Sequence, residues 1–150
     1  MTWWCPRCWA ELAGPHEACA CGYDPATDRR DLVERLADTL RHPLADRAVH
    51  AASVLGSIGD RRAVPALCAA LRAADPYLQA EAAAALGGIG CPEAVEPLAL
   101  LLEQGALPGR MAAVRALSAL GGDRARSALL RAAARDPVPA VRELAARLAA

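Results

Sequence analysis

From Asp28 onward the chain repeats itself with a period of 31 residues. Three leucine series share this spacing: Leu55, Leu86, Leu117, Leu148; Leu36, Leu67, Leu98, Leu129; and Leu40, Leu71, Leu102. A valine series runs alongside them: Val33, Val64, Val95. Several superposed series at one period indicate stacked copies of a single supersecondary unit. The sequence therefore predicts a repeat architecture over residues 28–150.

Each period divides into two short amphipathic helices. One is expected at about 45–57, where the glycines of Leu55-Gly56-Ser57-Ile58-Gly59 allow a left-handed helix end. The next is expected to begin near Ala63-Val64-Pro65, because proline is tolerated in a first turn, and to stop at Asp75-Pro76. The same punctuation predicts about eight helices in all, the first from about Asp28 and the last from Val138. Such small helices bury their apolar stripes only by stacking, so the expected fold is an all-α solenoid.

Composition agrees with closely packed helices. Apolar residues make up 55% of the chain and aromatic residues only 3%, with no phenylalanine. The core must therefore be built from alanine, leucine and valine. Alanine is the strongest helix former, whereas strands prefer β-branched and aromatic residues.

Two segments resemble a known family. The sequence around Ala94-Val95-Glu96-Pro97-Leu98 and the helix end at 81–90 are similar to the short HEAT-like repeats first described in phycobilisome lyases. The resemblance covers about residues 44–150. It implies a scaffold or adaptor that binds another protein, and it leaves a chromophore-lyase-like or maturation activity as an alternative. Arg126 departs from the valine series, which predicts that this helix is rotated or starts late.

The first 27 residues are expected to form a separate knuckle, bounded at Asp24-Pro25-Ala26-Thr27. Four cysteines lie here in two close pairs: Cys5, Cys8, Cys19 and Cys21. Four thiolates at this spacing can surround one tetrahedral Zn²⁺, with iron as the alternative metal. The piece resembles a zinc ribbon of the small rubredoxin-like type, but its second pair has one intervening residue, which admits His16 as a replacement ligand.

The expected role of this metal is structural. Four thiolates fill the coordination shell, whereas a catalytic zinc needs an open position. A piece this small cannot build a sufficient core, so metal binding would supply its folding free energy. Elsewhere the sequence contains no catalytic triad and no phosphate-binding loop, so no enzymatic activity is expected. Cys68 is expected as a small core residue and Cys91 as an exposed thiol.

A partner surface is expected on the second helix of each pair, on the concave side of the solenoid. Leu100 and Leu101 exceed what the core stripe needs, so at least one of them should face outward as an apolar anchor. The C-terminal repeats hold 8 arginines against 3 acidic residues, and three of these arginines share one helical face: Arg124, Arg131 and Arg135. Trp3 is a further candidate anchor. The expected partner is a protein, with nucleic acid as the alternative and no small-molecule substrate inferred.

The expected compartment is the cytoplasm. Formal net charge is zero, so no overall field steers the chain toward membranes or nucleic acid. No run of 18 apolar residues occurs, and residues 1–8 do not resemble a secretory signal. Six cysteines without such a signal favour a reducing compartment, where clustered cysteines bind metal.

Overall fold

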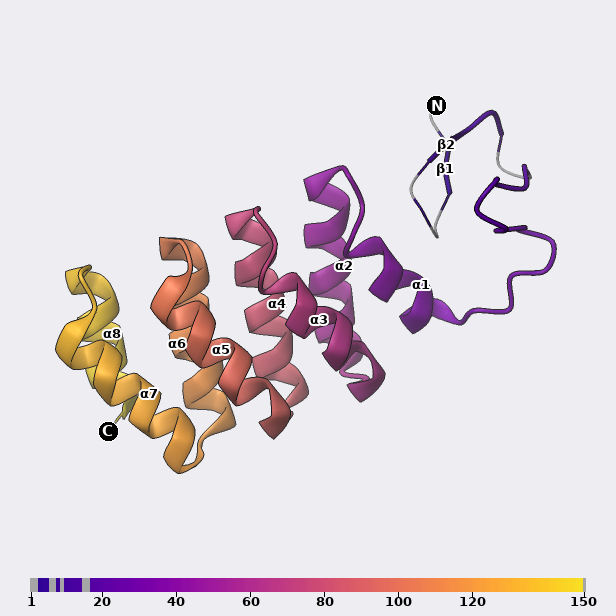
Figure 1. Cartoon of the computed structure of the whole chain (residues 1–150). Coiled ribbons are helices and arrows are strands. Elements are labelled where there is room, and N and C mark those ends of the chain that lie inside the picture. The colour runs from indigo at the N-terminus through magenta and orange to yellow at the C-terminus, as the bar shows by residue number, and fades with distance from the viewer. Residues whose placement is uncertain (1–2, 6–7, 9, 15–16, 150) are drawn as a thin grey trace.

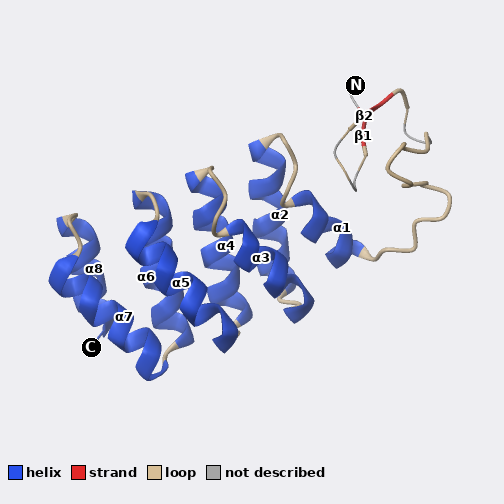
Figure 2. Ribbon diagram, in the orientation of Figure 1, coloured by secondary structure: helices blue, strands red, loops and turns tan. Residues whose placement is uncertain are grey.

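A computed structural model describes residues 3–5, 8, 10–14 and 17–149, and eight α-helices account for the repeats (Figures 1 and 2). In chain order they are α1 (Leu32–Thr39), α2 (Ala45–Ile58), α3 (Val64–Ala70), α4 (Pro76–Ile89), α5 (Val95–Gln104), α6 (Leu107–Leu120), α7 (Gly122–Arg135) and α8 (Pro139–Ala149). Two short antiparallel strands, β1 (Trp3–Trp4) and β2 (Glu11–Leu12), lie in the N-terminal piece. The predicted all-α solenoid of about eight helices is confirmed.

The helices form two rows (Figure 1). We call α2, α4, α6 and α8 the first helices, because each opens a predicted repeat, and α1, α3, α5 and α7 the second helices. Consecutive first helices pack closely together, whereas consecutive second helices make far fewer backbone contacts with one another. Hollows therefore open between neighbouring second helices. Within the described residues, no helix is both long and apolar enough to cross a lipid bilayer.

Helix boundaries follow the predicted signals. Asp31 caps α1 in a capping box with Glu34, and Asp75 accepts hydrogen bonds from the first backbone N–H groups of α4. Gly59 and Gly90 end α2 and α4 with φ of 73° each, a left-handed conformation that a residue with a Cβ adopts only with strain. The spacing of the repeats is thus set by local chemistry at each turn.

The predicted leucine series lie in the core, together with alanines and valines. The inner members are fully buried: Leu55, Leu67, Leu86, Leu98, Leu117 and Leu129. The terminal members Leu36 and Leu148 are only partly buried and pack against the edge of the core. Each belongs to an end of the stack, where neighbouring repeats cover one side only.

Small residues hold the row of first helices close together. A Cβ built at Gly56 would lie 2.9 Å from the Cα of Ala85, and one at Gly87 would lie 2.9 Å from the Cα of Ala116. These residues are equivalent in successive repeats, so α2 meets α4 in the same way as α4 meets α6. Only glycine permits so close a backbone approach.

Neighbouring glycines in α4 give a matched test of this packing. Gly87→Ala is expected to destabilise the protein by about 1–3 kcal/mol, because the new methyl group overpacks the contact with Ala116. Gly88→Ala is expected to stabilise it by up to about 1 kcal/mol, because its nearest neighbour is 3.9 Å away and alanine is the better helix former. Chemical denaturation of both variants measures the difference. Equal effects would show that the first helices are not in tight contact here.

The prediction made from Arg126 is wrong in part. A short 3₁₀ turn precedes α3 and another precedes α5, at Arg61–Ala63 and Pro92–Ala94, but α7 starts directly at Gly122 and therefore earlier in its repeat. The positive φ angles of Gly121 and Gly122 let the chain enter the helix without that turn. Arg126 is exposed, and Ala125 is buried beside it.

Candidate metal centre and partner-binding surface

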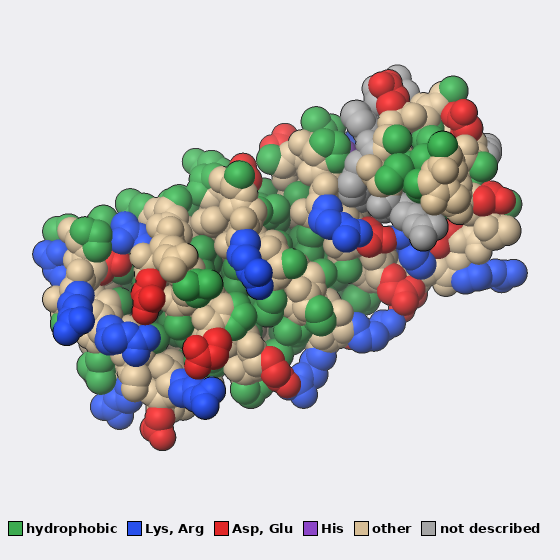
Figure 3. Space-filling model, in the orientation of Figure 1, with side chains coloured by type: hydrophobic (Ala, Val, Ile, Leu, Met, Phe, Trp, Pro, Cys, Tyr) green, Lys and Arg blue, Asp and Glu red, His purple; other side chains and the backbone are tan. Residues whose placement is uncertain are grey.

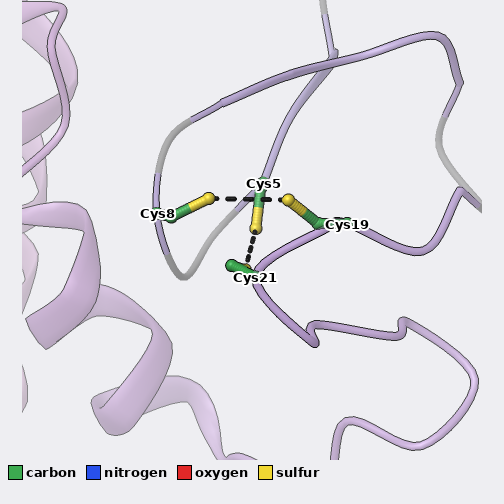
Figure 4. A group of neighbouring side chains, drawn as sticks. All are labelled: Cys5, Cys8, Cys19 and Cys21. Carbon is green, nitrogen blue, oxygen red and sulfur yellow. Dashed lines mark hydrogen bonds between the residues drawn. The ribbon is translucent and has the colours of Figure 1, made fainter.

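The four predicted cysteines come together in the N-terminal piece. Their sulfur atoms all lie within 4.8 Å of one another, and Figure 4 shows that they converge from two loops. The Sγ atoms of Cys5 and Cys21 are 3.5 Å apart, as are those of Cys8 and Cys19. Each of these contacts joins a cysteine of the first loop to a cysteine of the second. The sulfur cluster therefore forms only when the two loops lie together.

Backbone hydrogen bonds close each of the two cysteine loops. In the first loop, the N–H of Cys5 donates to the carbonyl of Ala10 at 2.8 Å, next to the β1–β2 pairing. In the second, the N–H of Cys19 donates to the carbonyl of Tyr23 at 2.7 Å, and Gly22 adopts a φ of 85°. The glycine permits the tight turn that brings the second pair back toward the first.

Backbone amides also point at sulfur. A hydrogen bond from the Tyr23 backbone lowers the pKa of Cys21 to about 7. The pKa of Cys19 is raised to about 12, since a hydrogen bond from the Cys21 backbone, which lowers it, is outweighed by burial and by the neighbouring thiols. Cys21 therefore loses its proton more readily than Cys19, and a metal ion that binds would have to displace the protons that remain.

The separations fit a tetrahedral metal site. With metal–sulfur bonds of about 2.3 Å, the sulfurs of a tetrahedron are about 3.8 Å apart. The observed contacts of 3.5 Å, within a group spanning no more than 4.8 Å, bracket this value. A disulfide requires about 2.05 Å, so neither of the two 3.5 Å contacts is a disulfide bond. These four residues could hold one metal ion.

The segment that follows the cluster is tied to the first helix. The guanidinium of Arg30 lies 5.6 Å from the ring centre of Tyr23 and pairs with Asp28 and Asp38. This pairing lowers the pKa of Asp28 to about 2. Arg30 thus connects the second cysteine loop, which contains Tyr23, to Asp38 of α1. The predicted domain boundary near residue 27 stays a prediction.

On α5, the two candidate leucines separate. Leu100 is 46% exposed and lies in a hollow between α3 and α5, as expected of an anchor. Leu101 is only 5% exposed, so Leu100 is the leucine of the two that faces outward, and the partner contact of either leucine stays a prediction. Gly105 and Gly109 explain the difference, because a Cβ at either position would collide with Leu101 Cδ1, at 2.6 and 3.2 Å respectively. Their missing side chains make room for Leu101 in the core.

The three predicted arginines of α7 are all exposed and share one side of the helix. Arg124 pairs with Glu96 of α5, and Arg131 pairs with Glu103, each at 3.5 Å. Glutamates of the preceding repeat therefore partly neutralise the expected basic patch. Of these three arginines, Arg135 alone has no ion pair among the described residues. Figure 3 shows basic and acidic side chains close together over this end of the stack. Exposed pairs of this kind contribute little stability and can exchange partners.

Other predicted residues have different outcomes. The side chains of Trp3 and His16 lie outside the described part of the chain, so their predicted roles stay predictions. Cys68 is half-buried, as expected of a small residue at the core edge. Cys91 is 2% exposed, so the expectation of an exposed thiol is wrong. It packs in the core at the turn before α5, and its Sγ lies 2.8 Å from Glu93 Oε2.

Three hollows between second helices were not predicted. The first lies between α1 and α3, the second between α3 and α5, and the third between α5 and α7, with volumes of about 460, 680 and 320 Å³. The 31-residue period of the sequence predicts which positions are equivalent in the three hollows. The sequence does not predict the depth of the hollows, because depth depends on how far apart the second helices stand.

The chain belongs to the HEAT-repeat family, whose sequence profile matches residues 33–106 and 64–150. No curated protein gives a significant match. Among solved structures 21 chains match, including human deoxyhypusine hydroxylase in complex with glycerol. That structure is 28% identical with a TM-score of 0.65, over 90% of this chain and 48% of the hydroxylase chain. The chain thus spans about half the length of that enzyme.

Proposed function

We propose that this protein is a non-catalytic scaffold that binds another protein along its second helices. The observation that carries the proposal is the position of Leu100, a large apolar side chain that is 46% exposed inside a hollow. Its surroundings include Leu71 and Pro97, with Arg72 and Glu96 at the rim. Apolar anchors that become fully buried in a pocket, within a polar rim, dominate the affinity of many protein interfaces.

The proposed metal of the N-terminal cluster is zinc in a structural role, with iron as the alternative. Its support is the convergence of four sulfurs at separations close to a tetrahedron. Four thiolate ligands leave no open coordination position for substrate or water. When bound, the metal would join the two cysteine loops into one folded unit.

Catalysis is the competing function, because the similar human protein is named as a hydroxylase. Its similarity covers less than half of its own length, and HEAT repeats serve in many non-catalytic proteins. Among the described residues, the group of side chains spaced to hold a metal is the four-cysteine cluster, which lies outside the repeats. These points favour the scaffold over an enzyme of that class.

Two variants test the scaffold with its native partner, recovered from cells by affinity capture. Leu100→Asp is expected to speed dissociation by at least about tenfold, because it removes a desolvated anchor. Arg131→Glu is expected to slow association and to weaken its salt dependence, as rim charges do. Surface-based kinetics measure both rates.

Matched controls separate this face from general surface effects. Leu107→Asp makes the same change at a side chain of nearly equal exposure, 45%, at the start of α6 and outside the hollows. Arg115→Glu makes the same charge reversal on an exposed residue of a first helix. Unchanged rates for Leu100→Asp and Arg131→Glu would refute binding along the second helices. The cysteine knuckle with Trp3 would then become the leading surface.

Nucleic acid is the alternative partner, because the C-terminal repeats carry a surplus of arginines. Pairing of Arg124 and Arg131 with glutamates interrupts any continuous phosphate track. A salt titration with random-sequence DNA distinguishes the two classes. Binding to phosphates would weaken steeply as salt rises, in proportion to the number of phosphates contacted.

A further inference from the structure

The three hollows are copies of one another at the repeat period. Lining positions of the first hollow recur 31 residues later in the second and again in the third. Each has a buried leucine at the same place: Leu40, Leu71 and Leu102. The framework of the hollow is therefore constant along the stack, and any difference between hollows comes from the positions that vary.

Two wall positions change chemistry from one hollow to the next. The first position is Ala69 in the first hollow, Leu100 in the second and Arg131 in the third. The second position holds alanine, glutamine and arginine in the same order: Ala73, Gln104 and Arg135. At these two positions the walls change from alanines, through leucine and glutamine, to two arginines. A third position changes in the opposite sense, from Arg41 and Arg72 in the first two hollows to Glu103 in the third. A ligand that crosses all three would meet a different requirement at each.

The third hollow carries an excess of positive charge. Arg110 lies at its base and pairs with the buried carboxylate of Asp136, at 2.9 and 3.0 Å from Nη1. Arg131 pairs with Glu103, while Arg135 has no ion pair among the described residues. The buried Nε of Arg110 also lacks a hydrogen-bond partner in the described part of the chain. The exposed guanidinium of Arg135 is thus available to an incoming anion.

We propose that the second and third hollows bind an extended peptide segment of the partner, with an apolar side chain in the second and a carboxylate in the third. This inference rests on the proposed function and specifies its ligand. A guanidinium binds a carboxylate with two parallel hydrogen bonds, which suits Arg135 at the wall of the third hollow. The exposed Leu100 contacts an apolar residue of the peptide, which precedes or follows the acidic residue.

Spacing sets the register of this segment. Helices in direct contact lie about 10 Å apart, and an extended chain rises about 3.3 Å per residue. The second helices make fewer contacts than this packing gives, so at least three residues are needed to span one repeat. The expected pattern is an apolar residue and an acidic residue three or four positions apart.

A displayed library of random linear dodecapeptides, selected on the intact protein, tests this register. Enriched peptides are expected to share the apolar–acidic spacing. Replacing the shared acidic residue by lysine should weaken binding to the native protein at least about tenfold in fluorescence anisotropy, as expected for loss of a close charge pair. The Arg135→Glu variant should reverse this preference, and Arg115→Glu should leave it unchanged. Circular dichroism confirms that both variants fold.

Selection that yields no enriched peptide, or peptides without an acidic residue at this spacing, would overturn the inference. So would an unchanged charge preference in Arg135→Glu. The proposed function is judged separately, from the kinetics of the native partner with Leu100→Asp. A partner that depends on Leu100 but shows no such motif would leave the scaffold intact and remove only the extended-peptide ligand.

Discussion

Metal-free protein is expected to lose the structure of its N-terminal piece and to keep its helical repeats folded. The cluster brings together cysteines from two loops, and a bound metal would bond to all four of them, so its removal should separate the loops. Structural zinc in such small units contributes apparent free energies of about 10–16 kcal/mol at neutral pH. Each repeat contacts mainly the repeats beside it, so the stability of the solenoid is expected to be independent of the N-terminal piece.

Elemental analysis and hydrogen exchange measure this effect. Protein purified without added metal should contain about one zinc per chain, as four thiolate ligands require. Cys21→Ser should abolish metal binding and exchange protection before residue 24 without reducing the helical circular dichroism. Cys68→Ser is the control, because its thiol lies on α3, away from the cluster. Strongly substoichiometric zinc and iron combined would refute the metal centre, and loss of helicity in Cys21→Ser would refute the independence of the two parts.

The second large effect is expected from α5, where a buried and an exposed leucine lie two residues apart. Leu98 is fully buried in the middle of the stack, and Leu98→Ala should destabilise the protein by about 2–5 kcal/mol through lost burial and the resulting cavity. Leu100→Ala should cost far less, because Leu100 is 46% exposed. Urea unfolding of the two variants gives the comparison. Equal losses would mean that the exposed face of α5 is assigned wrongly.

The fold was predictable because its determinants are local and repeated. A glycine ends each of the first helices α2, α4 and α6 (Gly59, Gly90 and Gly121) and fixes where one repeat stops. The buried leucines then fall at one period, so a single pattern specifies helix type, length and packing face. The four cysteines were predictable for a related reason, since close pairs of thiols have few structural uses other than metal binding.

Packing between neighbouring repeats could not be predicted in the same way. Leu101 is buried because Gly105 and Gly109 leave space beside it, which a helical stripe on α5 alone does not reveal. Cys91 is buried because the turn before α5 packs into the core. Arg131 has a glutamate partner because α5 and α7 face each other, and that contact joins different repeats. The identity of the metal could not be predicted for a different reason, which is that four thiolates bind both zinc and iron.

Photo-crosslinking at position 100 in living cells tests whether a protein partner binds along the second helices. A benzophenone amino acid replaces Leu100 in one variant and Leu107, of similar exposure but outside the hollows, in another. The scaffold predicts a discrete protein adduct from position 100 that is absent from position 107, with its crosslinked peptide identified by mass spectrometry. Absence of a protein adduct at position 100, or the same adducts from both positions, would contradict it.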